Sequence, residues 1–193
     1  IINIALPITG IRLLSSMISS VNSILVPRRL MAAGMASNDA VSTFGIMSGM
    51  VMPLLFLPFA VTSALSMVMI PNLSEDMIQN KWHNIRSKIS KAILITTLTA
   101  FPSAALLFST ARPLGILLYK QELVGVFLEP LACFAGLHGL QHTLAGILNG
   151  LGKQNRVAIH FAIGGILQIF CTWFLVSNPN LGIYGFIIGF IAS

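Results

Sequence analysis

The sequence predicts an all-α membrane protein, a bundle of about six transmembrane helices. Charged residues make up 8% of its 193 residues, whereas a soluble domain carries roughly 25%, and the mean hydropathy is +0.88. Uncharged runs also reach the about 18 residues that suggest a helix across the bilayer core; they cover residues 40–74, 92–111, 130–152 and 157–193. A transmembrane barrel would show alternating segments of about ten residues instead, and this sequence shows none.

Prolines shape the first two predicted helices. The first helix is expected over residues 4–26, where Pro27 ends it. The second lies within residues 40–70, a run longer than a core of about 30 Å requires at about 1.5 Å per residue. Pro53 and Pro58 fall inside this run. Because proline removes a backbone donor and clashes with the preceding turn, we expect a kinked or broken helix, with both prolines as candidate hinges.

Polar or glycine-rich connections separate the remaining helices. We expect residues 71–74 to end the second helix, and residues 75–91 to form a polar connection. Residues 112–122 connect the third helix to the fourth. These later helices are expected over residues 90–108, 124–148 and 157–176, with a last helix that begins near Leu181.

The chain is expected to form a single transmembrane bundle over residues 1–193. It begins at Ile1 instead of methionine and ends at Ser193 inside an apolar run, so we expect a fragment whose last helix is truncated. Cys133 and Cys171 lie in apolar segments, which predicts small buried side chains and neither a disulfide framework nor a metal site. The net charge of +6 lies mostly in the connections, which fits orientation in a membrane better than nucleic-acid binding.

A polar stripe follows one side of the first helix between residues 11 and 23. At about 100° per residue, apolar side chains such as Leu13 and Met17 fall on the opposite side. The stripe consists of Arg12, Ser15, Ser16, Ser19, Ser20, Asn22 and Ser23. An intramembrane charge is costly and usually faces a cavity or a partner. We therefore predict that the stripe lines a hydrophilic cavity; the alternative is an arginine that snorkels to the interface.

Several segments resemble a known family in their order and spacing. They read LPITGIRLL (6–14), ILVPRRL (24–30), MIPNLSED (69–76), ILNGLGKQ (147–154) and NPNLGIYG (178–185). The chain resembles the stage V sporulation protein B-like family, in the polysaccharide-transport branch of the multidrug/oligosaccharidyl-lipid/polysaccharide exporter superfamily. The resemblance covers essentially the whole sequence. It implies two pseudo-symmetric bundles of about six helices around a cavity that opens alternately to each side, with this chain at the start of the second bundle.

The resemblance also implies a function, which is flipping or export of a lipid-linked saccharide, such as the peptidoglycan precursor lipid II. The setting would be the cell membrane of a spore-forming bacterium. The partners would be that lipid-linked oligosaccharide, membrane lipids and, as a further candidate, a coupling cation. No cofactor and no covalent chemistry is implied, so we do not expect an enzyme. The alternative is a cation-coupled multidrug antiporter of the same superfamily, which would favour intramembrane acids; Glu129 is the one available.

Arg12 and the fourth helix supply the candidate binding residues for such a substrate. A guanidinium can hold phosphate oxygens bidentately, which suits the pyrophosphate of a lipid-linked sugar. His138, Gln141 and His142 share one face of the fourth helix and could hydrogen-bond sugar hydroxyls or relay protons. The alternative is that they join neighbouring helices. The histidines have the spacing of a zinc-protease motif, but Gly139 replaces its glutamate, which argues against that enzyme class.

Overall fold

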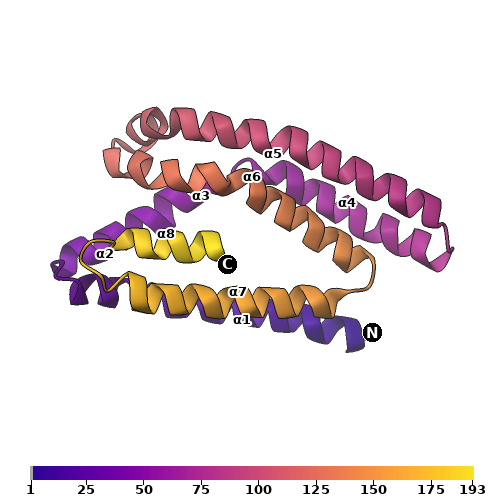
Figure 1. Ribbon diagram of the computed structural model, residues 1–193, viewed down its shortest axis with the longest axis horizontal. Helices are drawn as coiled ribbons and strands as arrows, with labels where there is room; N and C mark the ends of the chain where they lie inside the picture. The colour runs from indigo at the N-terminus through magenta and orange to yellow at the C-terminus, as the bar shows by residue number, and fades with distance from the viewer. Residues whose placement is uncertain (1) are drawn as a thin grey trace. The chain divides into compact units, whose positions relative to one another are not determined.

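The computed structural model of the protein describes the backbone of residues 2–193 and the side chains from Thr9 onward (Figure 1). Every regular element in this part of the chain is helical, which confirms the all-α class. In the same part, five helices are long and apolar enough to cross a membrane. They are Thr9–Ala32, Ser37–Phe56, Trp82–Tyr119, Glu122–Gly150 and Gln154–Leu175, and Ile183–Ala192 is a shorter apolar helix.

The chain divides into two compact units. Unit one comprises Ile1–Met50 and Ala158–Ser193, and unit two comprises Val51–Val157. The first boundary falls within a π-helical turn, η1 (Met47–Val51). The single bundle expected from the sequence stays a prediction.

Unit one contains α1 (Ile2–Ala32), α2 (Ser37–Ile46), most of α7 (Gln154–Leu175) and α8 (Ile183–Ala192). The prediction that Pro27 ends the first helix was wrong, because α1 continues for another turn to Ala32. Val26 and Leu30 are fully buried, and their burial offsets the backbone bond that the proline removes. Gly34 then ends the helical path with a φ of 99°, a conformation that glycine adopts without steric cost.

Two side-chain contacts tie α1 to α7 within unit one. The guanidinium carbon of Arg29 lies 3.2 Å from the centre of the Trp173 ring, close enough for a cation–π interaction. Ile18 packs so closely against Gly165 that any Cβ there would collide with it. α1 and α7 therefore meet through one charged and one small-residue contact.

Unit two contains α3 (Met52–Phe56), α4 (Phe59–Ile78), α5 (Trp82–Tyr119) and α6 (Glu122–Gly150). The expected broken second helix is confirmed, because a π-helical turn precedes α3 and a turn at Leu57–Pro58 separates α3 from α4. The predicted end at residues 71–74 was wrong. α4 continues through Pro71 to Ile78, and the burial of Leu73 together with the ion pair between Asp76 and Lys88 stabilises that extension.

The charged connections predicted around the third helix are mostly helical. α5 has 38 residues, so only residues 79–81 and 120–121 join it to its neighbours. Asn80 and Lys120 make these tight turns with φ values of 54° and 53°. Lysine, arginine and glutamate are good helix formers, and their charge alone does not break a helix. The fourth and fifth predicted helices and the last one agree with α6, α7 and α8 to within a few residues.

The three long helices of unit two pack side by side (Figure 1). An apolar cluster joins them and consists of Met69, Leu73, Ile85, Ala92 and Ile147. Two polar contacts lie beside this cluster. The hydroxyls of Thr96 and Thr143 are 2.9 Å apart and buried, and Lys88 Nζ lies 2.6 Å from a carboxylate oxygen of Asp76.

Glycines allow the closest approaches between these helices. A Cβ on Gly125 would lie 2.5 Å from the Cα of Arg112, and a Cβ on Gly146 would lie 2.9 Å from Ser66. Gly45 and Gly49 also have the spacing of a helix-packing pair, yet no atom of the described chain lies within 4 Å of a Cβ at either position. Close helix packing therefore centres on α6.

Substitution of Gly125 with alanine should weaken unit two. The added Cβ would meet backbone atoms of α5, and because these cannot rotate away, the loss should be about 1–3 kcal/mol. Thermal unfolding of the full-length protein in detergent measures it. The control is Gly45→Ala, where nothing lies within 4 Å and alanine favours the helix by about 0.5–1 kcal/mol. Equal melting temperatures for the two variants would contradict the close contact.

Loss of the Lys88 charge should also destabilise unit two. Asp76 is 6% exposed, and a buried carboxylate without its counter-charge costs about 3 kcal/mol. We therefore expect Lys88→Met to lower the melting temperature, and the double variant Lys88→Met/Asp76→Leu to recover most of the loss. The control is Lys91→Met, since Lys91 is exposed on the same helix. A similar small effect at both lysines would show that the ion pair contributes little.

Candidate functional site

The polar stripe of α1 lies on a helix of membrane-spanning length. Arg12, Ser15, Ser16, Ser19 and Ser23 are all exposed. The apolar side chains on the other side of the helix are exposed as well, so burial does not distinguish the two sides. What distinguishes the stripe is its hydrogen bonding.

Some serines of the stripe use their own helix as a partner. Ser20 donates its hydroxyl to the carbonyl of Ser16 at 2.9 Å, and Ser23 donates to Ser19 at the same distance. Such bonds let a hydroxyl lie in apolar surroundings. Among the described residues, Arg12, Ser15, Ser16 and Ser19 donate no side-chain hydrogen bond, and Arg12 has no ion-pair partner. The stripe therefore offers donors to an acceptor-rich ligand.

Asn22 differs from the rest of the stripe. Its side chain is buried, and its Oδ1 has no hydrogen-bond partner in the described chain. It lies one turn after Ile18, the residue that packs against Gly165 of α7. The structure thus places Asn22 in the interior of unit one, while its predicted role in a cavity stays a prediction.

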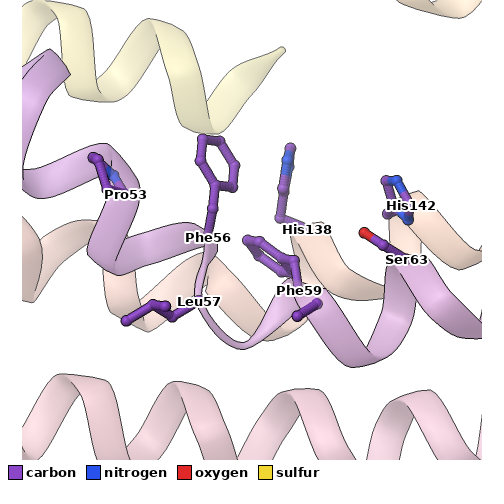
Figure 2. A pocket seen from close by; sticks show the side chains of 8 residues that line it. Pro53, Phe56, Leu57, Phe59, Ser63, His138 and His142 are labelled. Atoms are coloured by element: carbon purple, nitrogen blue, oxygen red, sulfur yellow. The ribbon is translucent and has the colours of Figure 1, made fainter.

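An open pocket of about 480 Å³ lies in unit two, where the chain breaks between α3 and α4. The break faces the middle of α6, and side chains of both elements project into the pocket (Figure 2). Its lining is mostly apolar, with three polar side chains. The lining residues are Pro53, Phe56, Leu57, Phe59, Ala60, Ser63, His138 and His142.

Aromatic rings form one side of this pocket. The ring centres of Phe56 and Phe59 are 5.6 Å apart with an angle of 51° between the planes. The His138 ring lies 5.3 Å from Phe59 in an edge-on arrangement and 6.2 Å from Phe56. These three residues form an aromatic cluster at the helix break. Gly139 allows it, because a Cβ there would lie 3.3 Å from the Phe59 ring.

Polar groups form the other side of the pocket. His142 Nδ1 lies 3.4 Å from the hydroxyl of Ser66, which restrains the imidazole. Ser63 also lines the pocket here (Figure 2). Gln141 lies outside the lining but hydrogen-bonds His138. The structure thus brings the three predicted residues of α6 together.

The pocket lies well inside the length of α6. His138 lies twelve residues before the end of α6 at Gly150 and sixteen after its start at Glu122, so it lies about 18 Å and about 24 Å from the two ends of the helix. Non-helical backbone at membrane depth is tolerated only where it is buried in protein or lines a hydrated cavity. The turn at Leu57–Pro58 must therefore be covered by protein or line a hydrated space, and its amides hydrogen-bond along the chain, from Leu57 N–H to Leu54 and from Ala60 N–H to Leu57.

Glu129, the acid expected for a cation-coupled antiporter, is paired. Its carboxylate lies 3.1 Å from Nε of Arg112, and this ion pair joins α6 to α5. No group of three or more His, Cys, Asp or Glu side chains that could hold a metal ion occurs in the described part of the chain. Neither observation supports a cation site at Glu129.

Sequence reasoning missed Phe56, Phe59, Ser63 and Ser66. The nearest signal was Pro58, which lies in the turn and caps the start of α4. Pro53, the other predicted hinge, lies in the first turn of α3 and lines the pocket. The hinge role of both prolines stays a prediction.

A comparison with protein families identifies the chain. The MatE family model matches residues 9–174. The chain belongs to the MatE family. This MatE chain is a multi-pass bacterial membrane protein, which confirms the predicted localisation and the family resemblance.

Two relatives of this MatE chain come from Bacillus subtilis (strain 168). It is 29% identical over 185 residues to Stage V sporulation protein B. The aligned region covers 96% of the chain and 36% of that protein. It is 25% identical over 186 residues to Sporulation protein YkvU. The aligned region covers 96% of the chain and 42% of that protein. The chain thus spans less than half the length of either relative. No solved structure matches it.

Proposed function

We propose that the full-length protein flips a lipid-linked saccharide, such as a peptidoglycan precursor, across the cell membrane of a spore-forming bacterium by alternating access. Membership of the MatE family and the likeness to two sporulation proteins support this proposal. The partners would be the lipid-linked oligosaccharide and membrane lipids. A coupling cation is a further candidate partner.

The guanidinium of Arg12 is the observation that carries the proposal. It lies on a spanning helix and has no counter-charge among the described residues, while serines beside it have free donors. An uncompensated charge at membrane depth is costly. A pyrophosphate would supply that counter-charge, and its oxygens match the fork of an arginine.

The work of such a protein is electrostatic and involves no covalent step. Moving a charged headgroup through an apolar core without partners costs many kcal/mol. Donors of the α1 stripe would replace the lost water around the phosphates, while the lipid tail stays in the bilayer. The helix break at Pro58 would let α3 and α4 move as separate rigid pieces when the cavity changes sides.

The ion pair at Glu129 favours a flippase over a cation-coupled multidrug antiporter. An antiporter of this kind would need an intramembrane acid that can exchange cations, whereas Glu129 pairs with Arg112. The pocket of unit two contains no acid among its lining residues. The uncharged sugar of the headgroup suits this lining better than a lipophilic cation does.

Substitution of Arg12 with alanine should abolish flipping. We expect the transport rate of a lipid-linked saccharide to fall at least about 30-fold in vesicles that contain the full-length variant, because the phosphates lose a desolvated ionic partner. Arg12→Lys should restore only part of the rate, since lysine lacks the fork geometry.

The control for this test is Arg28→Ala, an exposed arginine on the same helix and outside the stripe. It should flip at the normal rate, and all variants should insert and unfold like the native protein. Normal flipping by Arg12→Ala would remove the phosphate-binding role from α1.

A further inference from the structure

The pocket of unit two combines apolar surface with uncharged hydrogen-bonding groups. None of its eight lining residues is Asp, Glu, Lys or Arg. Two phenylalanine rings and aliphatic side chains supply apolar surface, while Ser63, His138 and His142 supply hydrogen-bonding groups. A ligand that fits must be uncharged where it enters and must have both an apolar face and hydroxyl groups.

We propose that this pocket binds a pyranose ring of the transported saccharide, as a subsite separate from the phosphate-binding stripe. This inference rests on the proposed function and adds to it the residues that recognise the sugar. The stripe binds the part of the headgroup that all polyprenyl diphosphates share. The pocket discriminates between polyprenyl diphosphates that carry different sugars.

The aromatic side of the pocket suits the ring carbons of a sugar. One face of a pyranose presents C–H groups, and the face of an aromatic ring carries partial negative charge that attracts them. Phe56 is 42% exposed and can present its ring to a sugar, whereas the buried Phe59 lies beside it with its plane at 51°. Figure 2 shows Phe56 projecting from the helix break on the same side as His138, so a stacked sugar would have a polar neighbour beside it.

The polar side of the pocket suits the hydroxyl groups of a sugar. A neutral imidazole has one donor and one acceptor nitrogen, and a hydroxyl can pair with either. Ser66 contacts Nδ1 of His142 at 3.4 Å, so a sugar hydroxyl would pair with the other nitrogen. The volume of about 480 Å³ lies within the range of about 300–1,000 Å³ usual for small-ligand pockets.

Two lipid substrates test the subsite in vesicles that contain the full-length protein. One is a polyprenyl diphosphate that carries a saccharide, and the other is the same polyprenyl diphosphate without sugar. The half-saturating concentration for flipping is measured for each. Phe56→Ala and His142→Ala should raise it about five- to tenfold for the sugar-bearing lipid and leave the sugar-free lipid unchanged. Arg12→Ala should impair both lipids.

Conservative variants separate stacking from simple packing. Phe56→Trp keeps an aromatic face and should retain the native half-saturating concentration, whereas Phe56→Leu keeps only apolar volume and should behave like Phe56→Ala. The control is Phe134→Ala, because Phe134 is 42% exposed, as Phe56 is, and lies on α6 outside the pocket. It should leave both lipids unaffected.

The outcomes distinguish failure of the proposed function from failure of the subsite. If the native protein flips neither lipid, the proposed function and the subsite are both overturned. If the native protein flips both and the pocket variants affect them equally or not at all, only the subsite is overturned. Competition by tetraphenylphosphonium that disappears in Phe56→Ala would assign the pocket to a lipophilic cation, and this also overturns the subsite.

Discussion

Glycines along one face of α6 determine how closely α4 can approach it, and the pocket depends on that distance. Gly139 accommodates the ring of Phe59, Gly146 accommodates Ser66, and Gly150 accommodates the backbone at Ile70. Their spacing of seven and four residues keeps them on one side of the helix. Because Ser66 lies against Gly146, its hydroxyl can reach His142 one turn earlier on α6. The same contact therefore packs the helices and orients a group of the binding site.

The charges of unit two show how a membrane chain handles ionic groups. Asp76 pairs with Lys88, and Glu129 pairs with Arg112, so each of these acids has its counter-charge on α5. Arg12 in unit one has none among the described residues. Since an unpaired charge is the expensive case in a membrane, this difference separates residues that hold the fold from Arg12, for which we propose a phosphate ligand.

Composition and proline positions predicted the fold class and the broken second helix. They could not predict the helix ends, because lysine, arginine and glutamate near Glu75–Lys91 resemble a loop in sequence yet continue α4 and α5. The side chains of α6 were predicted from their shared face. Phe56 and Phe59 were missed, because phenylalanines in so apolar a chain look like lipid-facing residues. Only the turn between them, which is a feature of the folded backbone, separates them from the others.

The length of α5 has a consequence for how unit two is held in the bilayer. Its 38 residues extend about 57 Å, whereas the hydrocarbon core is about 30 Å thick. At least one end must therefore reach the lipid headgroups. At its start, Trp82 is 57% exposed, beside Lys81 and close to Arg86. Tryptophan and basic residues prefer the boundary between water and acyl chains, so this end anchors α5 at the membrane interface. The anchor sets the depth of the helix break in the bilayer.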